Sequence, residues 1–283
     1  MTHASISRLS ARALIGLTAV CTGATTIVAQ QPLVMQRVTF TSDGNTLVGY
    51  LFKPEGNGPF PAVIWNHGSE KNPAPERQFR GAAGVFVPAG YVTLAVVRRG
   101  HGESGGDYIQ DVIQKERQAK GPQASEKLFV QLMEGEQLRD QLAGAAYLKT
   151  LPYVDANRLV VAGCSYGGIQ TLLGAASAGA YKAAVSISPG AESWNGHQQI
   201  QQMLIRAVDR TNIPVLIIHP EDDANVAPGY ALGQELQRLH KPYALHVYPP
   251  FGTAAEHGHC FGGAQGMHIW AADAIQFLHD ALR

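Results

Sequence analysis

The sequence predicts an α/β domain in which a mostly parallel central sheet carries helices on both faces. Short apolar runs rich in β-branched residues recur along the chain, each followed by Gly, Pro or polar residues, as is typical of buried parallel strands. These runs are PAVIWN (61–66), YVTLAVV (91–97), RLVVAG (158–163), KAAVSIS (182–188), PVLIIH (214–219) and ALHVYP (244–249). Helical segments separate them, and this alternation predicts one sheet covered on both sides.

The length and composition agree with this prediction. The chain has 283 residues, of which 45% are hydrophobic, enough for one large domain with an ordinary core. Lys plus Arg and Asp plus Glu both total 22, so no charge excess argues for nucleic acid, an anionic membrane or a strongly charged partner. Because no repeat or linker interrupts the chain, we expect residues 30–283 to form one domain.

The first 29 residues are typical of an export signal. Arg8 and Arg12 precede the apolar run 13–29, and cleavage after Ala29 would leave Gln30 first. A retained anchor is the weaker interpretation, since Thr and Gly dilute the run and polar residues follow it. We therefore expect a signal peptide over 1–29, a periplasmic or secreted protein, and no stable membrane span after signal removal.

A hairpin and three amphipathic helices are predicted within the domain. Residues 33–40 and 46–54 flank TSDGN, whose Asp-Gly pair predicts a hairpin turn at the start of the domain. Apolar stripes at helical spacing predict amphipathic helices that cover the sheet. The stripes are Leu138, Leu142, Ala145 and Ala146; Ala231, Leu232, Leu236 and Leu239; and Trp270, Ala274, Phe277, Leu278 and Ala281.

Two serines lie in a Gly-x-Ser-x-Gly pattern, and their surroundings differ. Ser165 follows the strand-like run 158–163 and precedes the apolar helical stretch 169–180, as a nucleophile elbow requires. Ser104 follows RRGHGE and is followed by a polar segment that does not resemble a helix packed under a sheet. We expect Ser165 to be the nucleophile and Ser104 to belong to a loop that caps a strand end.

A serine nucleophile needs a histidine base and an acid that orients the histidine. In chains with such an elbow, both partners follow the serine, the acid after a later strand and the histidine before the last helix. Glu221, Asp222 and Asp223 follow the run 214–219, and His257 and His259 lie in EHGHCFGG. The residues alone leave these alternatives open.

From about Val34 to Arg283 the chain resembles the α/β-hydrolase superfamily, in its dienelactone-hydrolase-like and prolyl-oligopeptidase-like branches. The stretches 40–68, 98–106 and 154–168 carry this resemblance. The register of the family's acid turn favours Asp223, with Pro220 in the usual glycine position. The family's Gly-His-x-Phe pattern favours His259. The resemblance implies an α/β-hydrolase fold with a Ser165, His259 and Asp223 triad.

An oxyanion hole completes such a site through two backbone N–H groups. One is expected from Tyr166, directly after the nucleophile. The His67-Gly68 turn resembles the family's His-Gly turn and points to Ser69 for the other. His67 itself is expected to be structural, and no histidine or cysteine spacing suggests a metal site or a cofactor.

Two segments are expected to shape specificity. Residues 107–133 exceed an ordinary connection and suggest a lid or cap insertion. The stretch 189–212 is expected to contribute Trp194 to the pocket.

Cys164 and Cys260 each adjoin a candidate catalytic residue, and whether they form a disulfide is left open.

These observations predict an exported serine hydrolase, independent of cofactors, that cleaves small carboxylic esters or lactones through an acyl-enzyme. Dienelactone hydrolases proper use cysteine where Ser165 stands, which argues against their particular substrate and favours a general esterase. A serine peptidase of the prolyl-oligopeptidase-like type is the alternative. A non-catalytic binding protein on the same fold is weaker, and the sequence does not predict the oligomeric state.

Overall fold

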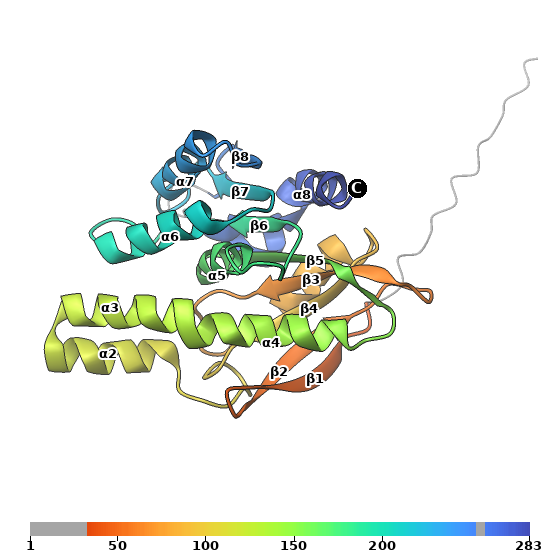
Figure 1. The fold of residues 1–283 in the computed structure, drawn as a ribbon, viewed down its shortest axis with the longest axis horizontal. Helices are drawn as coiled ribbons and strands as arrows, with labels where there is room; N and C mark the ends of the chain where they lie inside the picture. The colour runs from red at the N-terminus through yellow and green to blue at the C-terminus, as the bar shows by residue number, and fades with distance from the viewer. Residues whose placement is uncertain (1–32, 253–257) are drawn as a thin grey trace, which may run out of the picture. The chain divides into compact units, whose positions relative to one another are not determined.

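The computed structural model describes residues 33–252 and 258–283 (Figure 1). The predicted signal segment, residues 1–29, and the alternative base His257 lie outside the described residues. No helix in the described part of the chain is long and apolar enough to cross a membrane.

An eight-stranded sheet forms the centre of the domain, in the order β1-β2-β4-β3-β5-β6-β7-β8 (Figure 1). β1 pairs antiparallel with β2 and β2 with β4, whereas every pair from β4 to β8 is parallel. The strands are β1 (Gln36–Ser42), β2 (Asn45–Phe52), β3 (Phe60–Asn66), β4 (Val92–Val97), β5 (Val154–Cys164), β6 (Ala184–Ile187), β7 (Val215–Pro220) and β8 (Tyr243–Tyr248). The predicted mostly parallel sheet is confirmed.

Helices cover both faces of this sheet. One hydrophobic core lies between the sheet and α4 (Leu138–Lys149), α5 (Tyr166–Ala175), α6 (Gln198–Arg210) and α7 (Ala227–Arg238). A second core lies beneath α1 (Arg80–Phe86) and α8 (Met267–Ala281) on the other face. Neighbouring strand residues alternate between the two cores: Ile64 joins the first, while Val63 and Trp65 join the second.

The Asp-Gly turn of the first hairpin forms as predicted. Ser42 pairs with Asn45, which leaves Asp43 and Gly44 as a two-residue loop. Both residues have positive φ, 48° and 80°, the backbone that a tight hairpin of this length requires and that Asp-Gly adopts readily.

The segment expected to form a cap is a helical hairpin beside the main helix layer (Figure 1). Gly121 has φ of 87°, ends α2 (Ile109–Lys120) and lets Pro122 begin α3 (Pro122–Leu132). The chain then continues through the short π-helix η2 (Met133–Gln137) into α4. Glu126 of α3 accepts the backbone N–H of Gln199 at 2.7 Å, which caps α6 and fastens the hairpin to it.

One predicted helix face is wrong in detail. Ala146 is exposed, whereas Gln141 and Gly144 face the sheet with Ala145. α4 packs so tightly on β4 that a Cβ on Gly144 would lie 2.4 Å from Val96. Gln141 is buried because it hydrogen-bonds with Asn66 of β3 at 2.9 Å. A buried polar contact and a close approach therefore orient this helix, and the apolar stripe does not reveal either.

Candidate active site

Ser165 lies on a tight turn between β5 and α5. Its backbone has φ of 60° and ψ of −119°, a conformation that residues with a side chain rarely adopt. The Ser165 N–H donates to the carbonyl of Ile187 at 3.0 Å, and its carbonyl accepts the N–H of Ile169. The turn is thereby tied to β6 on one side and to α5 on the other.

The glycines around Ser165 are required by close packing. A Cβ on Gly163 would lie 2.6 Å from the carbonyl oxygen of Gly167. A Cβ on Gly167 would lie 2.0 Å from the carbonyl oxygen of Asn66, and one on Gly168 would lie 2.6 Å from that of Ile187. The strand and helix can approach this closely only without these side chains, as a nucleophile elbow requires.

Ser104, the serine of the other Gly-x-Ser-x-Gly stretch, uses its hydroxyl in two hydrogen bonds. Ser104 is buried, and its Oγ accepts the N–H of Val48 at 2.8 Å and donates to the carbonyl of Val97 at 2.7 Å. These bonds join the glycine-rich loop to β2 and to the end of β4. Ser104 therefore acts as a structural bridge.

The structure brings His259 and Asp223 together. His259 begins the 3₁₀ segment η3 (His259–Gly266), and its Nδ1 lies 2.6 Å from Oδ1 of Asp223. Burial would lower the pKa of His259, but the hydrogen bond to Asp223 and the charges of Asp223 and Glu192 raise it. Nε2 of His259 is buried and has no hydrogen-bond partner among the described residues. This nitrogen is therefore free to exchange a proton with a group in the cavity.

Asp223 is held by contacts that sequence reasoning missed. His219, at the end of β7, places its Nδ1 2.8 Å from Oδ2 of Asp223, and the Ala224 N–H donates to Oδ1. Burial would raise the pKa of Asp223, but hydrogen bonds from His219, His259 and Ser188 hold it well below its usual range. The carboxylate therefore stays ionised at neutral pH. A histidine at the end of a buried strand, four residues before the acid, was the available signal in the sequence.

Asp222 and Glu221 lie next to Asp223 in different environments. The carboxylate of Asp222 accepts the backbone N–H groups of Phe251 at 2.9 Å and Gly252 at 2.7 Å. Its carbonyl accepts the N–H of Gly258, so Asp222 binds the residue directly before His259. Glu221 is exposed. Of the three acids, Asp223 is the one that contacts the histidine.

The turn after β3 is held from behind by a buried arginine. Arg98 donates to the carbonyls of His67 at 2.8 Å and Gly68 at 2.6 Å. Burial lowers the pKa of Arg98 to about 10, so it remains charged at neutral pH. Because C=O and N–H point in opposite directions across a planar trans peptide, the Ser69 N–H points away from Arg98.

His67 supports the same turn. Its Nδ1 lies 2.9 Å from the carbonyl of Gly68, and its Nε2 accepts the N–H of Arg98 at 3.3 Å. Burial, with the charges of Arg98 and His101, lowers the pKa of His67 well below its usual range, so the ring is neutral. These contacts give His67 a structural place in the turn.

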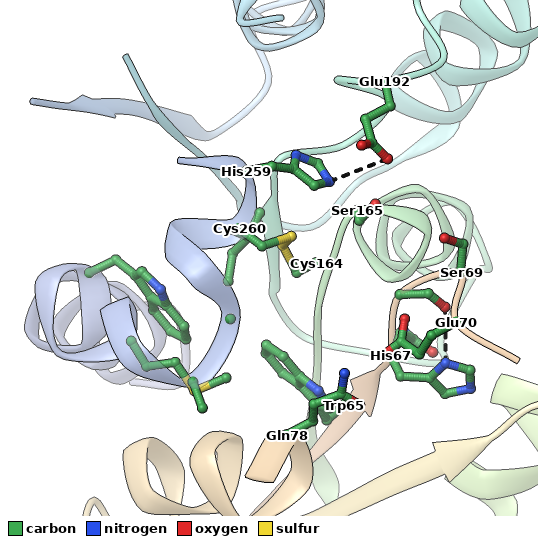
Figure 2. Close-up of a pocket in the computed structure, with 17 residues that line it drawn as sticks. Trp65, His67, Ser69, Glu70, Gln78, Cys164, Ser165, Glu192, His259 and Cys260 are labelled. Carbon is green, nitrogen blue, oxygen red and sulfur yellow. Dashed lines mark hydrogen bonds and ion pairs between the residues drawn. A yellow bond between two sulfur atoms is a disulfide. The ribbon is translucent and has the colours of Figure 1, made fainter. Parts of the chain in front are cut away.

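A cavity of about 220 Å³ is lined by Ser165, by His259 and by the turn after β3, residues 67–70 (Figure 2). Ser165, His259 and Glu192 lie together at one end, and Nε2 of His259 is 3.8 Å from the Glu192 carboxylate. Trp65 and Trp270 contribute to its apolar wall. Glu192 is another residue that sequence reasoning missed, because its loop carries no recognisable motif.

A smaller cavity of about 130 Å³ also reaches Ser165 and is lined by Gln110 of α2 and by Tyr166. Gln110 donates to the hydroxyl of Tyr166 at 3.0 Å. Trp194, expected in the pocket, packs against the hydrophobic core, and the part of its loop that lines this cavity is residues 190–193.

Cys164 and Cys260, whose pairing the sequence left open, form a disulfide that lines the larger cavity (Figure 2). Within residues 33–252 and 258–283, no group of three or more His, Cys, Asp or Glu side chains is placed to hold a metal ion.

Comparisons with known proteins bear on the fold and on the family likeness of the chain. Residues 121–204, from α3 into α6, match the prolyl oligopeptidase family. The chain is 25% identical over 248 residues to the "uncharacterized peptidase YtmA" of Bacillus subtilis (strain 168), covering 78% of this chain and 86% of that protein.

Two solved structures show the same fold. The esterase PF2001 of Pyrococcus furiosus matches 89% of this chain and 92% of its own, with a TM-score of 0.64 and 16% identity. The acylaminoacyl peptidase of Pyrococcus horikoshii matches 89% of this chain with a TM-score of 0.64 and 18% identity, and the match spans 42% of the peptidase. These comparisons support the prolyl-oligopeptidase side of the predicted resemblance, while the dienelactone-hydrolase side stays a prediction. The chain therefore has the α/β-hydrolase fold and is similar to the prolyl-oligopeptidase-like branch of serine hydrolases.

Proposed function

We propose that this protein is a serine hydrolase that cleaves carboxylic esters or lactones through an acyl-enzyme. One observation carries the proposal: His259 binds Asp223 through Nδ1, its Nε2 has no hydrogen-bond partner among the described residues, and His259 and Ser165 line the same cavity. A histidine held in this tautomer, next to a serine on a strained elbow, is the arrangement that activates a hydroxyl.

In the proposed mechanism, Ser165 Oγ attacks the carbonyl carbon of the substrate as its proton passes to Nε2 of His259. Asp223 orients the ring and stabilises the imidazolium that forms. The tetrahedral intermediate collapses when the imidazolium gives its proton to the leaving alkoxide. Water then attacks the acyl-enzyme by the same route and releases the acid and free Ser165.

The charge on the tetrahedral oxygen needs N–H donors, and we assign the amides of Ser69 and Tyr166 to this task. Tyr166 is the first residue of α5, where backbone N–H groups have no partner within the helix. The Ser69 amide is oriented by Arg98, which binds the carbonyl of the same peptide group. The buried guanidinium also places a positive charge behind the proposed oxyanion hole.

A serine peptidase of the prolyl-oligopeptidase-like type is the second candidate. The match of residues 121–204 to the prolyl oligopeptidase family and the peptidase relative favour it. The same triad would serve both reactions, so the leaving group decides between them. Turnover of short acyl esters and lactones should be compared with turnover of prolyl and aminoacyl amides. A kcat/KM that is higher for amides than for matched esters would contradict the esterase assignment.

The nucleophile is tested with a fluorophosphonate probe and two matched variants. Wild type should be labelled, Ser165→Ala should lose both labelling and turnover, and Ser104→Ala should keep both. Labelling of Ser165→Ala at the wild-type rate would refute the assignment. A wild type that neither labels nor turns over any substrate would favour the non-catalytic binding protein.

We further propose that residues 1–29 direct export and are removed. The Cys164–Cys260 disulfide supports this, since such bonds persist in oxidising compartments. Cell fractionation and N-terminal sequencing of the mature protein test it, with Gln30 expected first. Recovery of the protein in the cytoplasm with Met1 intact would contradict it.

We also propose that the α2–α3 hairpin acts as a cap, because Gln110 of α2 lines the smaller cavity beside Ser165. Gln110→Ala should change the relative kcat/KM for short and long acyl chains. An unchanged ratio would contradict a role in specificity.

A further inference from the structure

We propose that the Cys164–Cys260 disulfide is a positioning element of the active site that fixes His259 relative to Ser165, so that its reduction slows turnover without unfolding the protein. The inference rests on the proposed function. Cys164 directly precedes Ser165, and Cys260 directly follows His259. Their Cα atoms lie 6.0 Å apart although 96 positions separate them in the chain.

The Cys164 end of this bond is rigid. Cys164 is the last residue of β5, which pairs with strands on both sides. The next residues are fixed by the hydrogen bond from Ser165 to Ile187 and by the close packing of Gly163 and Gly167. Ser165 therefore holds its position whether or not Cys164 is bonded.

The Cys260 end has an unfavourable backbone. Four consecutive residues after His259 have positive φ: 55° at Cys260, 56° at Phe261, 63° at Gly262 and 70° at Gly263. Cysteine and phenylalanine are disfavoured in this region because Cβ crowds the backbone. Contacts from outside the segment must therefore hold it in place.

Noncovalent contacts hold both ends of this segment: the Gly258 N–H donates to the carbonyl of Asp222, and the Phe261 N–H donates to the carbonyl of Gly258. Phe261 is fully buried against the rings of Tyr248 and Phe251, and the Cys260 N–H donates to Ser188 Oγ at 3.3 Å. Asp223 fixes one nitrogen of the imidazole, and all of these contacts are noncovalent. The disulfide provides the covalent link from this backbone to the rigid elbow.

This bond is open to chemical control. Both cysteines are partly exposed and line the cavity that holds Ser165, so a small dithiol can reach them. One thiolate of the reagent attacks one sulfur, and the other cysteine leaves as a thiolate and takes up a proton. The second thiol of the reagent then closes its own disulfide. Two electrons pass to the protein, and both cysteines end as thiols.

The experiment compares the oxidised protein, the dithiol-reduced protein and the Cys164→Ser/Cys260→Ser double variant. Reduction, verified by the gain of two free thiols per chain, should lower kcat for an ester by about 10- to 100-fold, as expected when reacting groups shift by about 1 Å. KM should change by less than about twofold, because the pocket wall remains. Reoxidation should restore kcat, and the double variant should show the low kcat with no response to the dithiol.

The outcomes are distinct. Each form is also followed by circular dichroism and by its rate of fluorophosphonate labelling at the assay temperature. A reduced protein that keeps its kcat overturns the proposal, as does loss of activity that coincides with loss of tertiary structure. An oxidised wild type that neither labels nor hydrolyses contradicts the proposed function itself. Wild-type activity with no response to verified reduction contradicts this inference alone.

Discussion

The two Gly-x-Ser-x-Gly stretches of this chain have the same pattern but place the serine hydroxyl in different surroundings. At Ser104 the hydroxyl is bound on both sides by backbone groups of Val48 and Val97. At Ser165 the hydroxyl lies in a cavity with His259, and the backbone is held in an unfavourable conformation. A serine motif identifies a nucleophile only when the structure around it leaves the hydroxyl free.

The glycines of the two stretches also serve different purposes. In the Ser104 loop, Gly100, Gly102 and Gly106 have positive φ, so the backbone conformation requires them. At the elbow, Gly163 and Gly167 do not have positive φ, and it is the neighbouring carbonyl oxygens that exclude a Cβ. The Ser104 loop thus needs glycine for its positive φ, and at Gly100 also because a Cβ would lie 2.3 Å from the backbone of Asp107, whereas close packing alone excludes a Cβ at Gly163 and Gly167.

The largest expected effect is at Asp223, the proposed acid of the Ser165 site. Asp223→Asn should lower kcat/KM by about 10⁴-fold, because an amide neither stabilises the imidazolium nor fixes the correct tautomer. Asp222→Asn is the matched control, since it changes the neighbouring carboxylate, which binds Phe251 and Gly252. Steady-state ester hydrolysis measures both. Equal losses in the two variants would contradict the assignment of Asp223.

The next effect tests the packing of the elbow. Gly167→Ala should destabilise the fold by about 3 kcal/mol or more, since the new Cβ meets backbone that cannot move easily. Gly105→Ala, next to Ser104, should change stability by less than about 0.5 kcal/mol, because its Cβ would lie 3.5 Å from the nearest atom. Urea unfolding of both variants measures the difference. A stable Gly167→Ala protein would show that strand and helix can separate here.

Ser104→Ala should lower the free energy of unfolding by about 1 to 2 kcal/mol, because the N–H of Val48 and the carbonyl of Val97 both lose a buried partner. Its kcat should stay within about twofold of wild type. Thermal unfolding and ester hydrolysis on the same preparation measure both quantities. A large fall in kcat with unchanged stability would contradict the assignment of Ser165 as the nucleophile and favour Ser104.

The smallest effect concerns charge near the proposed base. Neutral His259 is the active form, so activity should rise with pH through its pKa, which Asp223 and Glu192 raise. Glu192→Gln removes one of these charges and should move the acid limb of kcat/KM to lower pH, more clearly at low salt because Glu192 is exposed. Glu103→Gln, beside Ser104, is the control and should leave the limb in place. A shift to higher pH in Glu192→Gln would contradict the expected sign.

The sequence predicted the sheet and the elbow because both depend on contiguous residues. Strand runs, the Asp-Gly turn and the strand-serine-helix order all leave local signals. The choice between Asp222 and Asp223 is different, because adjacent side chains point in different directions and only the fold shows which one meets His259. Arg98, His219 and Glu192 escaped prediction for the same reason. Arg98 and Glu192 meet their partners across long sequence separations, and His219, four positions before Asp223, lies in no motif that marks it.

The backbone of Ser165 has a consequence for how this chain has been selected. At φ of 60° and ψ of −119°, glycine would relax the turn, and a protein used only for binding would gain stability from that replacement. A serine at this angle is therefore kept at a cost in stability. The strained turn thus favours a chain maintained for turnover, in which some stability is given up to keep one hydroxyl in place.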